Sequence, residues 1–327
     1  MRLYQKFVTV TVMGMFVCIL ITRKLKHKSS KNNRNRNRKM SIRYDDSWFK
    51  SSYIINEESL CRDTNADILF YIHTAPNHKN HRDIIRSTWG GKKQYRDYKI
   101  TMVFLLGHSN DDQINEGIHN ESTIHHDIIQ GTFRDTYLNL TYKARMGLNW
   151  VNAHCSNAKF IIKTDDDVFV NIPILIKKLE ELEIKNETKN LLMCSVIYED
   201  KVNRNELHKN YVSEDEYDVH EPDIYPDYCP GMAFVLSRNA LMKIHTLLNY
   251  TRFLKVDDVY ITGILAKMAG IKHKDSTKLT GIDGLWGIKW PWEEYKDLDR
   301  SRLNQYMFIL VEGKPESIGE IWENMQF

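Results

Sequence analysis

From Cys61 onward the sequence alternates between short apolar runs and segments with helical periodicity, and this alternation is the strongest constraint on its fold. Buried strands are predicted for four of the apolar runs: Asp67–Thr74, Lys99–Gly107, HHDIIQG and KFIIK. Apolar residues at helical spacing predict a helix over Tyr137–Val151. Strands that alternate with helices are typical of an α/β layered fold.

Two further helices and one long insertion complete the predicted domain. HRDIIRSTWG predicts a short helix that ends at Gly90, and NIPILIKKLEEL predicts a helix with Asn171 as its N-cap. The stretch from about Ile184 to Tyr228 is polar and rich in turn-forming residues, which indicates an inserted lobe or a long loop. Loops of this length in compact domains usually carry function or are disordered.

Three consecutive carboxylates follow the run KFIIK, and a second apolar run follows them. In an extended chain Asp165 and Asp167 point to one side and Asp166 to the other. Ligands of open α/β sheets bind at the carboxyl ends of the strands, and two converging carboxylates suit Mg²⁺ or Mn²⁺. The alternative is a solvated acidic turn, but the apolar flanks favour a metal site at the edge of a sheet.

A second acidic pair, Asp257 and Asp258, lies in FLKVDDVYITGILAKMAG. Either carboxylate can cap a helix that runs to Met268, with Gly270 as its C-terminal stop. The second interpretation makes one of them a general base that takes a proton from an acceptor hydroxyl near the metal.

The N-terminal segment has the composition of a membrane anchor. Sixteen uncharged, mainly apolar residues run from Phe7 to Thr22, between Lys6 and Arg23. A bilayer core takes about 20 residues, and roughly 17 is the usual lower edge, so the run suits a thin early-secretory or Golgi membrane. We predict an uncleaved signal-anchor because no small-residue cleavage site follows the run, and a cleaved signal peptide is the alternative.

A basic and polar stretch from Arg23 to Arg43 follows the anchor and reads as a solvated tether. By the positive-inside rule alone, its charges would place the C-terminal part in the cytosol. Cysteine usage favours the lumen instead. The predicted organisation is a cytoplasmic tail over residues 1–6, an anchor over 7–22, a luminal stem over 23–60 and a luminal catalytic domain over 61–327.

Four cysteines lie outside the anchor, and an even number fits two disulfides in an oxidising lumen. Cys61 and Cys155 each precede a predicted strand by about half a dozen residues, so they lie at the same edge of the sheet if those strands are parallel neighbours. We therefore predict the pairs Cys61–Cys155 and Cys194–Cys229, while the two other pairings stay open. Four N-x-S/T sequons add weak support, because roughly three would arise by chance.

Taken together, the ordered motifs resemble the β1,3-galactosyltransferase family, which also includes β1,3-N-acetylglucosaminyltransferases and, more distantly, the Fringe enzymes. The motifs are HRDIIRSTWG, FLLG, HHDIIQGTFRDTYLNLTYKARMGLNWV, CSNAKFIIKTDDDVFVN, YPDYCPGMAFVLS, VDDVYITGILAKMAGI and KPESIGEIW. The resemblance implies a GT-A-type, Rossmann-like mixed sheet flanked by helices and preceded by a single transmembrane helix. It also implies a type II Golgi protein that transfers a hexose from a UDP-sugar to the 3-hydroxyl of an acceptor glycan with inversion.

The resemblance further implies roles for individual residues. Asp258 would be the catalytic base, and Asp165 and Asp167 would hold Mn²⁺ or Mg²⁺. Donor-site contacts are implied for Arg82, Arg86, Asp127, Lys143, Asp165, Asp166 and Gly231. Arginine and lysine suit phosphate oxygens, while a carboxylate can accept hydrogen bonds from uracil or ribose. Outside the family context, Arg86 would be interpreted as a surface ion-pair partner and Lys143 as part of the solvated face of its helix.

Two segments depart from the family pattern. A Gly-rich CSGGGY or CSGTGY turn is usual, whereas Cys229–Phe234 reads CPGMAF and keeps Gly231 alone; larger side chains are expected to narrow the backbone's approach to a ligand. Relatives also carry a metal-binding His before the P-E segment, but this chain reads FILVEGKPE, where Glu312 is the nearest replacement ligand. A catalytically inactive glycan-binding or protein-binding homologue is therefore the alternative.

The expected substrates are UDP-galactose, or next UDP-N-acetylglucosamine, and an acceptor glycan on a glycoprotein or glycolipid. The anchor makes the membrane a further partner, and a homodimer is a further option. Nucleic acid is not expected, because the net charge is only +3 and the basic tether has no aromatic residue for stacking on bases.

Overall fold

A computed structural model describes residues 53–218, 223–277, 303–311 and 314–325. The predicted tail and anchor, most of the predicted stem, and Glu312 lie outside the described residues. Apart from the short turn over Leu248–Tyr250, the elements and clefts discussed below belong to one compact unit, residues 47–248 and 253–327. Within the described ranges, no helix has the length and apolar character needed to span a bilayer.

Two sheets form in the described part of the chain. Their strands are β1 (Tyr53–Ile55), β2 (Ile68–His73), β3 (Gln94–Tyr95), β4 (Tyr98–His108), β5 (Ile128–Arg134), β6 (Phe160–Asp165), β7 (Val168–Val170), β8 (Leu192–Cys194), β9 (Ala233–Ser237), β10 (His273–Asp275) and β11 (Phe308–Leu310). The main sheet has the order β1-β5-β4-β2-β6-β9-β8-β10, with β3 paired to β4, and the small sheet pairs β11 with β7.

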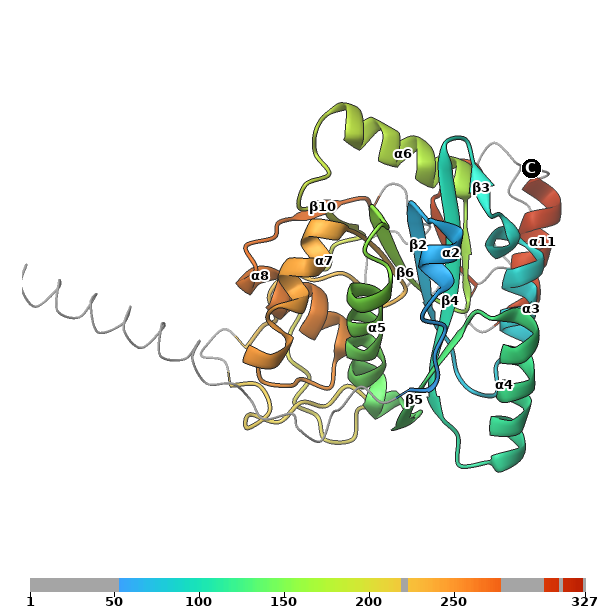
Figure 1. The fold of residues 1–327 in the computed structure, drawn as a ribbon. Coiled ribbons are helices and arrows are strands. Elements are labelled where there is room, and N and C mark those ends of the chain that lie inside the picture. The colour runs from blue at the N-terminus through green and yellow to red at the C-terminus, as the bar shows by residue number, and fades with distance from the viewer. Residues whose placement is uncertain (1–52, 219–222, 278–302, 312–313, 326–327) are drawn as a thin grey trace, which may run out of the picture. The chain divides into compact units, whose positions relative to one another are not determined.

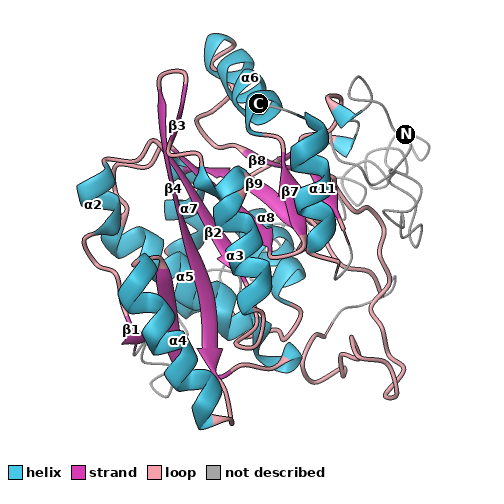
Figure 2. Ribbon diagram, turned by 90° about the vertical axis from the view of Figure 1, so that its right-hand side faces the viewer, coloured by secondary structure: helices cyan, strands magenta, loops and turns pink. Residues whose placement is uncertain are grey.

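Helices cover both faces of the main sheet (Figure 1). They are α2 (Leu60–Thr64), α3 (Lys79–Ser87), α4 (Asp112–His125), α5 (Leu140–His154), α6 (Ile172–Ile184), α7 (Arg238–His245), α8 (Ala266–Met268) and α11 (Glu316–Met325), with short turns η1 (Trp89–Gly91), η2 (Tyr137–Asn139) and η3 (Leu248–Tyr250) and a π-helical segment η4 (Val259–Leu265). Apolar residues of α3, α4, α6 and α11 share one core, and those of α5, α7 and η4 share the other. Figure 2 shows α3 and α4 lying across one face of the sheet.

Four strands in the middle of the sheet are parallel: β5, β4, β2 and β6. Their side chains are almost all buried, as expected for parallel strands covered on both faces. β6 also pairs with the antiparallel strand β9, so the sheet is mixed. The register places His73 of β2 beside Asp165 of β6, which brings the ends of these two strands together.

Most predicted strands and helices are confirmed, apart from small shifts at their ends. The helix predicted to run to Met268 is π-helical over Val259–Leu265 and α-helical only over Ala266–Met268. Asn171 caps α6 by accepting a hydrogen bond from the Ile174 backbone N–H at 3.3 Å. Gly270 follows α8 with a φ of +68°, a left-handed conformation that favours glycine. The segment predicted to be an inserted lobe or long loop contains the strand β8. The strand β1 lies within the predicted stem and pairs with β5, so the folded part begins before Cys61.

Both predicted disulfides are confirmed, Cys61–Cys155 and Cys194–Cys229. Cys61 lies in α2 and Cys155 ends α5, where both precede parallel neighbours, β2 and β6. The second disulfide joins β8 to the segment that leads into β9.

A candidate active site at the carboxyl edge of the sheet

A cleft of about 660 Å³ opens where the four parallel strands end. Its walls come from the loops after β2, β4, β5 and β6, and include residues 73–78, 109–111, 134–137 and 165–167. Sequence reasoning placed a ligand site at this edge because strand ends converge there. We call this space the first cleft.

The three consecutive carboxylates all line the first cleft. Asp165 is the last residue of β6, and Asp166 and Asp167 form the turn into β7. β7 is held by its antiparallel partner β11, and the Asp167 carbonyl accepts a hydrogen bond from Val311 N–H at 2.9 Å. Asp165 and Asp167 are half-buried, and their oxygen donors fit the hard divalent cation that the resemblance implies.

Asp165 has a cationic neighbour that sequence reasoning missed. The Lys163 ammonium is buried, donates to Asp165 Oδ1 at 2.5 Å and also donates to the Gly231 carbonyl. The signal was present, because Lys163 interrupts an apolar strand two residues before Asp165 and therefore lies on the same face. A charged lysine in a buried strand needs a partner.

Asp166 points to a different set of partners. Its Oδ2 accepts a hydrogen bond from the Thr74 hydroxyl at 2.5 Å and lies 2.9 Å from His78 Nδ1. His81 Nδ1 lies 3.4 Å from the other carboxylate oxygen. Burial opposes ionisation of Asp166, but the contacts with His78, His81 and Thr74 outweigh it and hold the pKa of the carboxyl well below its usual value.

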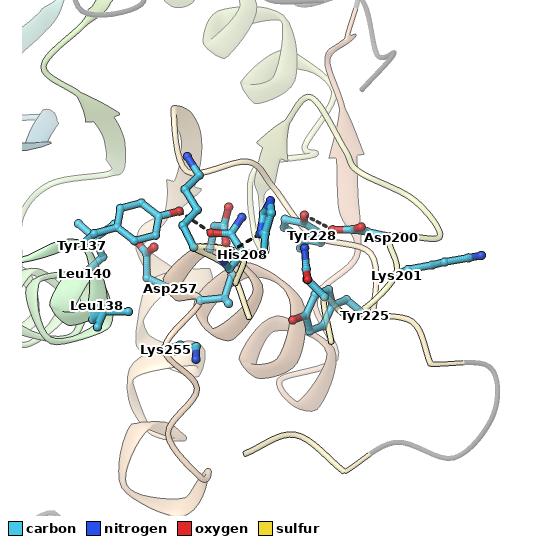
Figure 3. A pocket seen from close by; sticks show the side chains of 15 residues that line it. Tyr137, Leu138, Leu140, Asp200, Lys201, His208, Tyr225, Tyr228, Lys255 and Asp257 are labelled. Carbon is cyan, nitrogen blue, oxygen red and sulfur yellow. Dashed lines mark hydrogen bonds between the residues drawn. The ribbon is translucent and has the colours of Figure 1, made fainter. Parts of the chain in front are cut away.

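A second, smaller cleft of about 220 Å³ contains the other acidic pair, Asp257 and Asp258. Figure 3 shows Tyr137 and Leu140 on one side of it and Tyr225 on the other. Tyr137 and Leu140 also line the first cleft, so the two clefts meet at these side chains. We call this space the second cleft.

Asp258 fills the first of the two roles that the sequence left open, the cap of a helix. Its Oδ1 accepts a hydrogen bond from Val259 N–H at 2.8 Å and so caps η4, while Oδ2 accepts one from Gly231 N–H at 3.2 Å. Burial, and then the negative charge of Asp257, raise the pKa of Asp258 to about 7. A carboxylate with a pKa near 7 suits general base catalysis at neutral pH.

The two acidic groups are joined through one short chain of contacts. Lys163 binds both Asp165 and the carbonyl of Gly231, and the N–H of Gly231 binds Asp258. A Cβ on Gly231 would lie 3.7 Å from both Lys163 Nζ and Asp258 Oδ2, which is ordinary contact distance. Gly231 therefore sits at the junction between the end of β6 and the start of η4.

The larger residues of the altered glycine turn pack into the core. Met232, Ala233 and Phe234 are buried, and none of them lines the first or second cleft. Phe234 packs edge-on to Tyr71 at 6.5 Å between ring centroids. Within the described residues, their bulk fills the protein interior rather than either cleft.

The predicted donor-site arginines lie beside the first cleft rather than among its lining residues. Arg82 is 1% exposed and donates to Glu121 at 2.8 and 2.6 Å. Arg86 forms a bidentate pair with Asp127 at 2.9 and 2.8 Å. Their role as nucleotide contacts stays a prediction, and Glu121 is a partner that sequence reasoning missed.

Lys143 lines the first cleft, as predicted for a donor-site residue. Its ammonium donates to the Thr74 carbonyl at 2.6 Å and to Asp135 at 3.0 Å. Arg82 also donates to the Ala75 carbonyl at 2.9 Å, so two cations hold the loop after β2.

Known proteins resemble this chain in sequence. The Galactosyltransferase family profile matches residues 80–277, which are more than half of the 327 residues. Beta-1,3-galactosyltransferase 1 of Mus musculus is 34% identical over 220 residues, 67% of this chain and 65% of that protein. UDP-GalNAc:beta-1,3-N-acetylgalactosaminyltransferase 1 of Mus musculus is 32% identical over 212 residues, 64% of this chain and 62% of that protein.

The matched part thus spans slightly less than two thirds of each relative. Among solved structures, the WbbM bifunctional glycosyltransferase has a TM-score of 0.40 at 10% identity, over 80% of this chain and 50% of that one, which is too low to carry an argument. The match to the family profile covers α3 through β10 and includes the three consecutive carboxylates and Asp258. This chain belongs to the galactosyltransferase family.

Proposed function

We propose that the protein is an inverting β1,3-glycosyltransferase that moves a hexose from a UDP-sugar to the 3-hydroxyl of an acceptor glycan on a glycoprotein or glycolipid. Galactose is the favoured hexose. The observation that carries the proposal is the meeting of two clefts at Tyr137 and Leu140, with three carboxylates in one and a pair including Asp258 in the other. A donor and an acceptor need two such adjoining spaces.

The proposed chemistry is a single displacement. Asp258 in the second cleft accepts the proton of the acceptor 3-hydroxyl, whose oxygen then bonds to the anomeric carbon as the bond from that carbon to UDP breaks. Attack from the face opposite to UDP inverts the configuration. Gly231 N–H holds Asp258 Oδ2 in place, which fixes the direction of the carboxylate before reaction.

The first cleft is the proposed donor site. Asp165 and Asp167 would hold Mn²⁺ or Mg²⁺ there, and such an ion neutralises negative charge on a diphosphate leaving group. Lys143 adds a cation to the wall of the same cleft. Lys163 donates to one carboxylate oxygen of Asp165 and so restricts the orientation of that side chain.

The identity of the sugar is the least constrained part of the proposal. The two relatives named above carry galactosyltransferase and N-acetylgalactosaminyltransferase in their names, and UDP-N-acetylglucosamine was the second donor expected from the sequence. We further propose a Golgi, single-pass type II location with a luminal catalytic domain, supported by the apolar run Phe7–Thr22 and two disulfides.

The test is UDP release by the purified full chain in detergent. The enzyme is incubated with Mn²⁺ and one of three donors: UDP-galactose, UDP-N-acetylgalactosamine or UDP-N-acetylglucosamine. Each donor is combined with galactosyl, N-acetylgalactosaminyl, N-acetylglucosaminyl and mannosyl acceptors. The linkage in each product is then analysed. We expect acceptor-dependent UDP release from one donor and a loss of about 10²–10⁴-fold in Asp258→Asn. Equal release by wild type and Asp258→Asn with every donor would refute the base assignment.

The second candidate is a catalytically inactive glycan-binding homologue. The altered glycine turn and the missing C-terminal His favour it, since both depart from the family pattern. In that case no donor gives UDP release, while an acceptor glycan still binds the chain in a calorimetric titration.

A further inference from the structure

His78, His81 and Asp166 form a cluster at the rim of the first cleft. The carboxylate comes from the turn between β6 and β7, and the two histidines come from the start of α3, 88 and 85 residues away in the sequence. Because His78 and His81 are three positions apart at a helix start, they lie on one face. Their rings stack at 4.2 Å between centroids and 13° between planes.

The spacing of the three groups suits a metal ion. His78 Nδ1 lies 2.9 Å from Asp166 Oδ2, and His81 Nδ1 lies 3.4 Å from Asp166 Oδ1. One ligand atom can be chosen from each residue so that all three lie within 4.8 Å of one another. An ion bound about 2.1 Å from nitrogen and oxygen ligands separates neighbouring ligands by roughly 3.0–3.5 Å. Small shifts of the two histidines therefore bring all three groups into one coordination sphere.

The surroundings also suit an ion. The Thr74 hydroxyl donates to Asp166 Oδ2 at 2.5 Å and orients the carboxylate, as partners of metal ligands commonly do. Asp166 and His81 are only 9% and 10% exposed at their side chains, whereas His78 is 37% exposed. Two ligands are thus fixed in the protein, and the third faces the first cleft, which gives an ion a path of entry.

We propose that His78, His81 and Asp166 bind a divalent transition-metal ion whose remaining coordination positions face the first cleft. Imidazole nitrogen binds ions such as Zn²⁺ and Co²⁺ well, whereas Mg²⁺ selects oxygen donors. The cluster is therefore a site of a different chemical type from the Asp165 and Asp167 pair. It goes beyond the proposed function, because it needs the geometry of the cleft but no glycosyl transfer.

Metal binding is measured directly on the purified full chain in detergent, after removal of bound metal with a chelator. Excess Mg²⁺ is present to occupy sites made of oxygen donors alone. Co²⁺ is then added while its visible absorption is followed, and bound Co²⁺ is counted by equilibrium dialysis and elemental analysis. The same titration is carried out on His78→Asn, His81→Asn and the double variant.

The matched control is the double variant His119→Asn/His125→Asn, which removes two exposed histidines from α4. We expect wild type and control to bind one Co²⁺ that the His78/His81 double variant lacks. Each single variant should weaken binding at least ~10-fold, because even partners outside the coordination sphere are worth about 10–100-fold in metal affinity. Thermal unfolding without metal checks that the variants are folded.

Unchanged Co²⁺ stoichiometry and affinity in the double variant would overturn the proposal, as would an equal loss in the control. The result of the Co²⁺ titration can be distinguished from the result of the glycosyltransferase test. Asp258→Asn should lose about 10²–10⁴-fold of its acceptor-dependent UDP release and still bind Co²⁺ as wild type does. Conversely, a chain that releases no UDP from any donor can still show the His78-dependent Co²⁺ site.

Discussion

At the scale of single residues, the site depends on how buried charges are partnered. Lys163, Asp165 and Asp258 are linked through both backbone groups of Gly231, whose carbonyl and N–H point to opposite charges. Buried charges are tolerated only when paired or hydrogen-bonded. The same link therefore stabilises the fold and fixes the position of the Asp165 carboxylate relative to that of Asp258.

The pH dependence of the reaction follows from Asp258. Its pKa is raised to about 7 by burial and by the charge of Asp257, and only the deprotonated form can accept the acceptor proton. We expect kcat/KM to rise about tenfold per pH unit below pH 7 and to level off above it. A flat profile between pH 5 and pH 8, measured with a metal-saturated enzyme, would contradict the role of Asp258 as base.

Replacing Lys163 tests the link between the two acidic groups. Lys163→Met leaves the Gly231 carbonyl without its side-chain donor and Asp165 without its cation, so the free energy of unfolding should fall by ~1–3 kcal/mol. Activity should fall as well, because Asp165 loses its orientation. The measurement is denaturant unfolding together with UDP release.

The control for that variant is Lys159→Met, one residue before the start of the same strand. The Lys159 side chain is 59% exposed and pairs with Asp67 at 3.2 Å, an ion pair in water that contributes little. Equal destabilisation by both substitutions would argue against a special role of Lys163.

At the scale of elements, strand ends and helix starts bring the chemistry together. β6 delivers Asp165 to the first cleft, β9 follows directly after the glycine turn, and η4 begins at Asp258. Cys229 N–H donates to the Thr262 hydroxyl of η4 at 2.9 Å, so the turn is tied to η4 as well as to β8. The hydrogen bond and the disulfide position Gly231 between the carboxylates of Asp165 and Asp258.

The two disulfides should therefore differ in their effect on activity. Cys194→Ala/Cys229→Ala frees the turn that carries Gly231, whereas Cys61→Ala/Cys155→Ala frees α2 from α5, away from both clefts. Each double variant should lose about 2–5 kcal/mol of unfolding free energy. Well below the unfolding temperature, we expect UDP release to fall far more in the Cys194/Cys229 variant.

Each variant is measured at the same number of degrees below its own melting temperature. Similar activities in the two variants would show that the turn keeps its position without the Cys194–Cys229 disulfide. Thermal melting curves set those temperatures. Each variant thus serves as the matched control for the other.

At the scale of the whole folded unit, one sheet edge brings together residues from His73 to Asp258 in the sequence. The first cleft uses loops after β2, β4, β5 and β6, and the second uses η2, the 200–210 loop and the start of η4. Tyr137 and Leu140 line both spaces, and Tyr137 is 50% exposed. Its hydroxyl donates to Asn210 at 2.6 Å, across the second cleft.

Removing the Tyr137 side chain should affect catalysis more than stability. In Tyr137→Ala we expect KM for the acceptor to rise about tenfold or more, because an aromatic contact surface at the meeting of the clefts is lost. The unfolding free energy should change by less than about 0.5 kcal/mol, as for other exposed positions. Tyr198→Ala, which removes a tyrosine of 54% exposure outside both clefts, is the control.

The sequence by itself determined the features that depend on local pattern. Strands and helices follow from apolar periodicity, the Asn171 cap and the Gly270 stop from residue type, and the position of the three acids from their place after a buried strand. The cysteine positions favoured the observed disulfide pairing but left two others open, and the parallel pairing of β2 with β6 decided between them.

Only the tertiary structure decided which side chains become partners. Lys163 meets the Gly231 carbonyl across 68 residues, and His78 meets Asp166 across 88, so neither contact has a local signature. Such pairs depend on strand register, since a shift of one residue would turn every side chain of β6 to the other face. The packing of α3 against α4 and the start of β5 pairs Arg82 with Glu121 and Arg86 with Asp127. Tertiary packing likewise buries Met232 and Phe234.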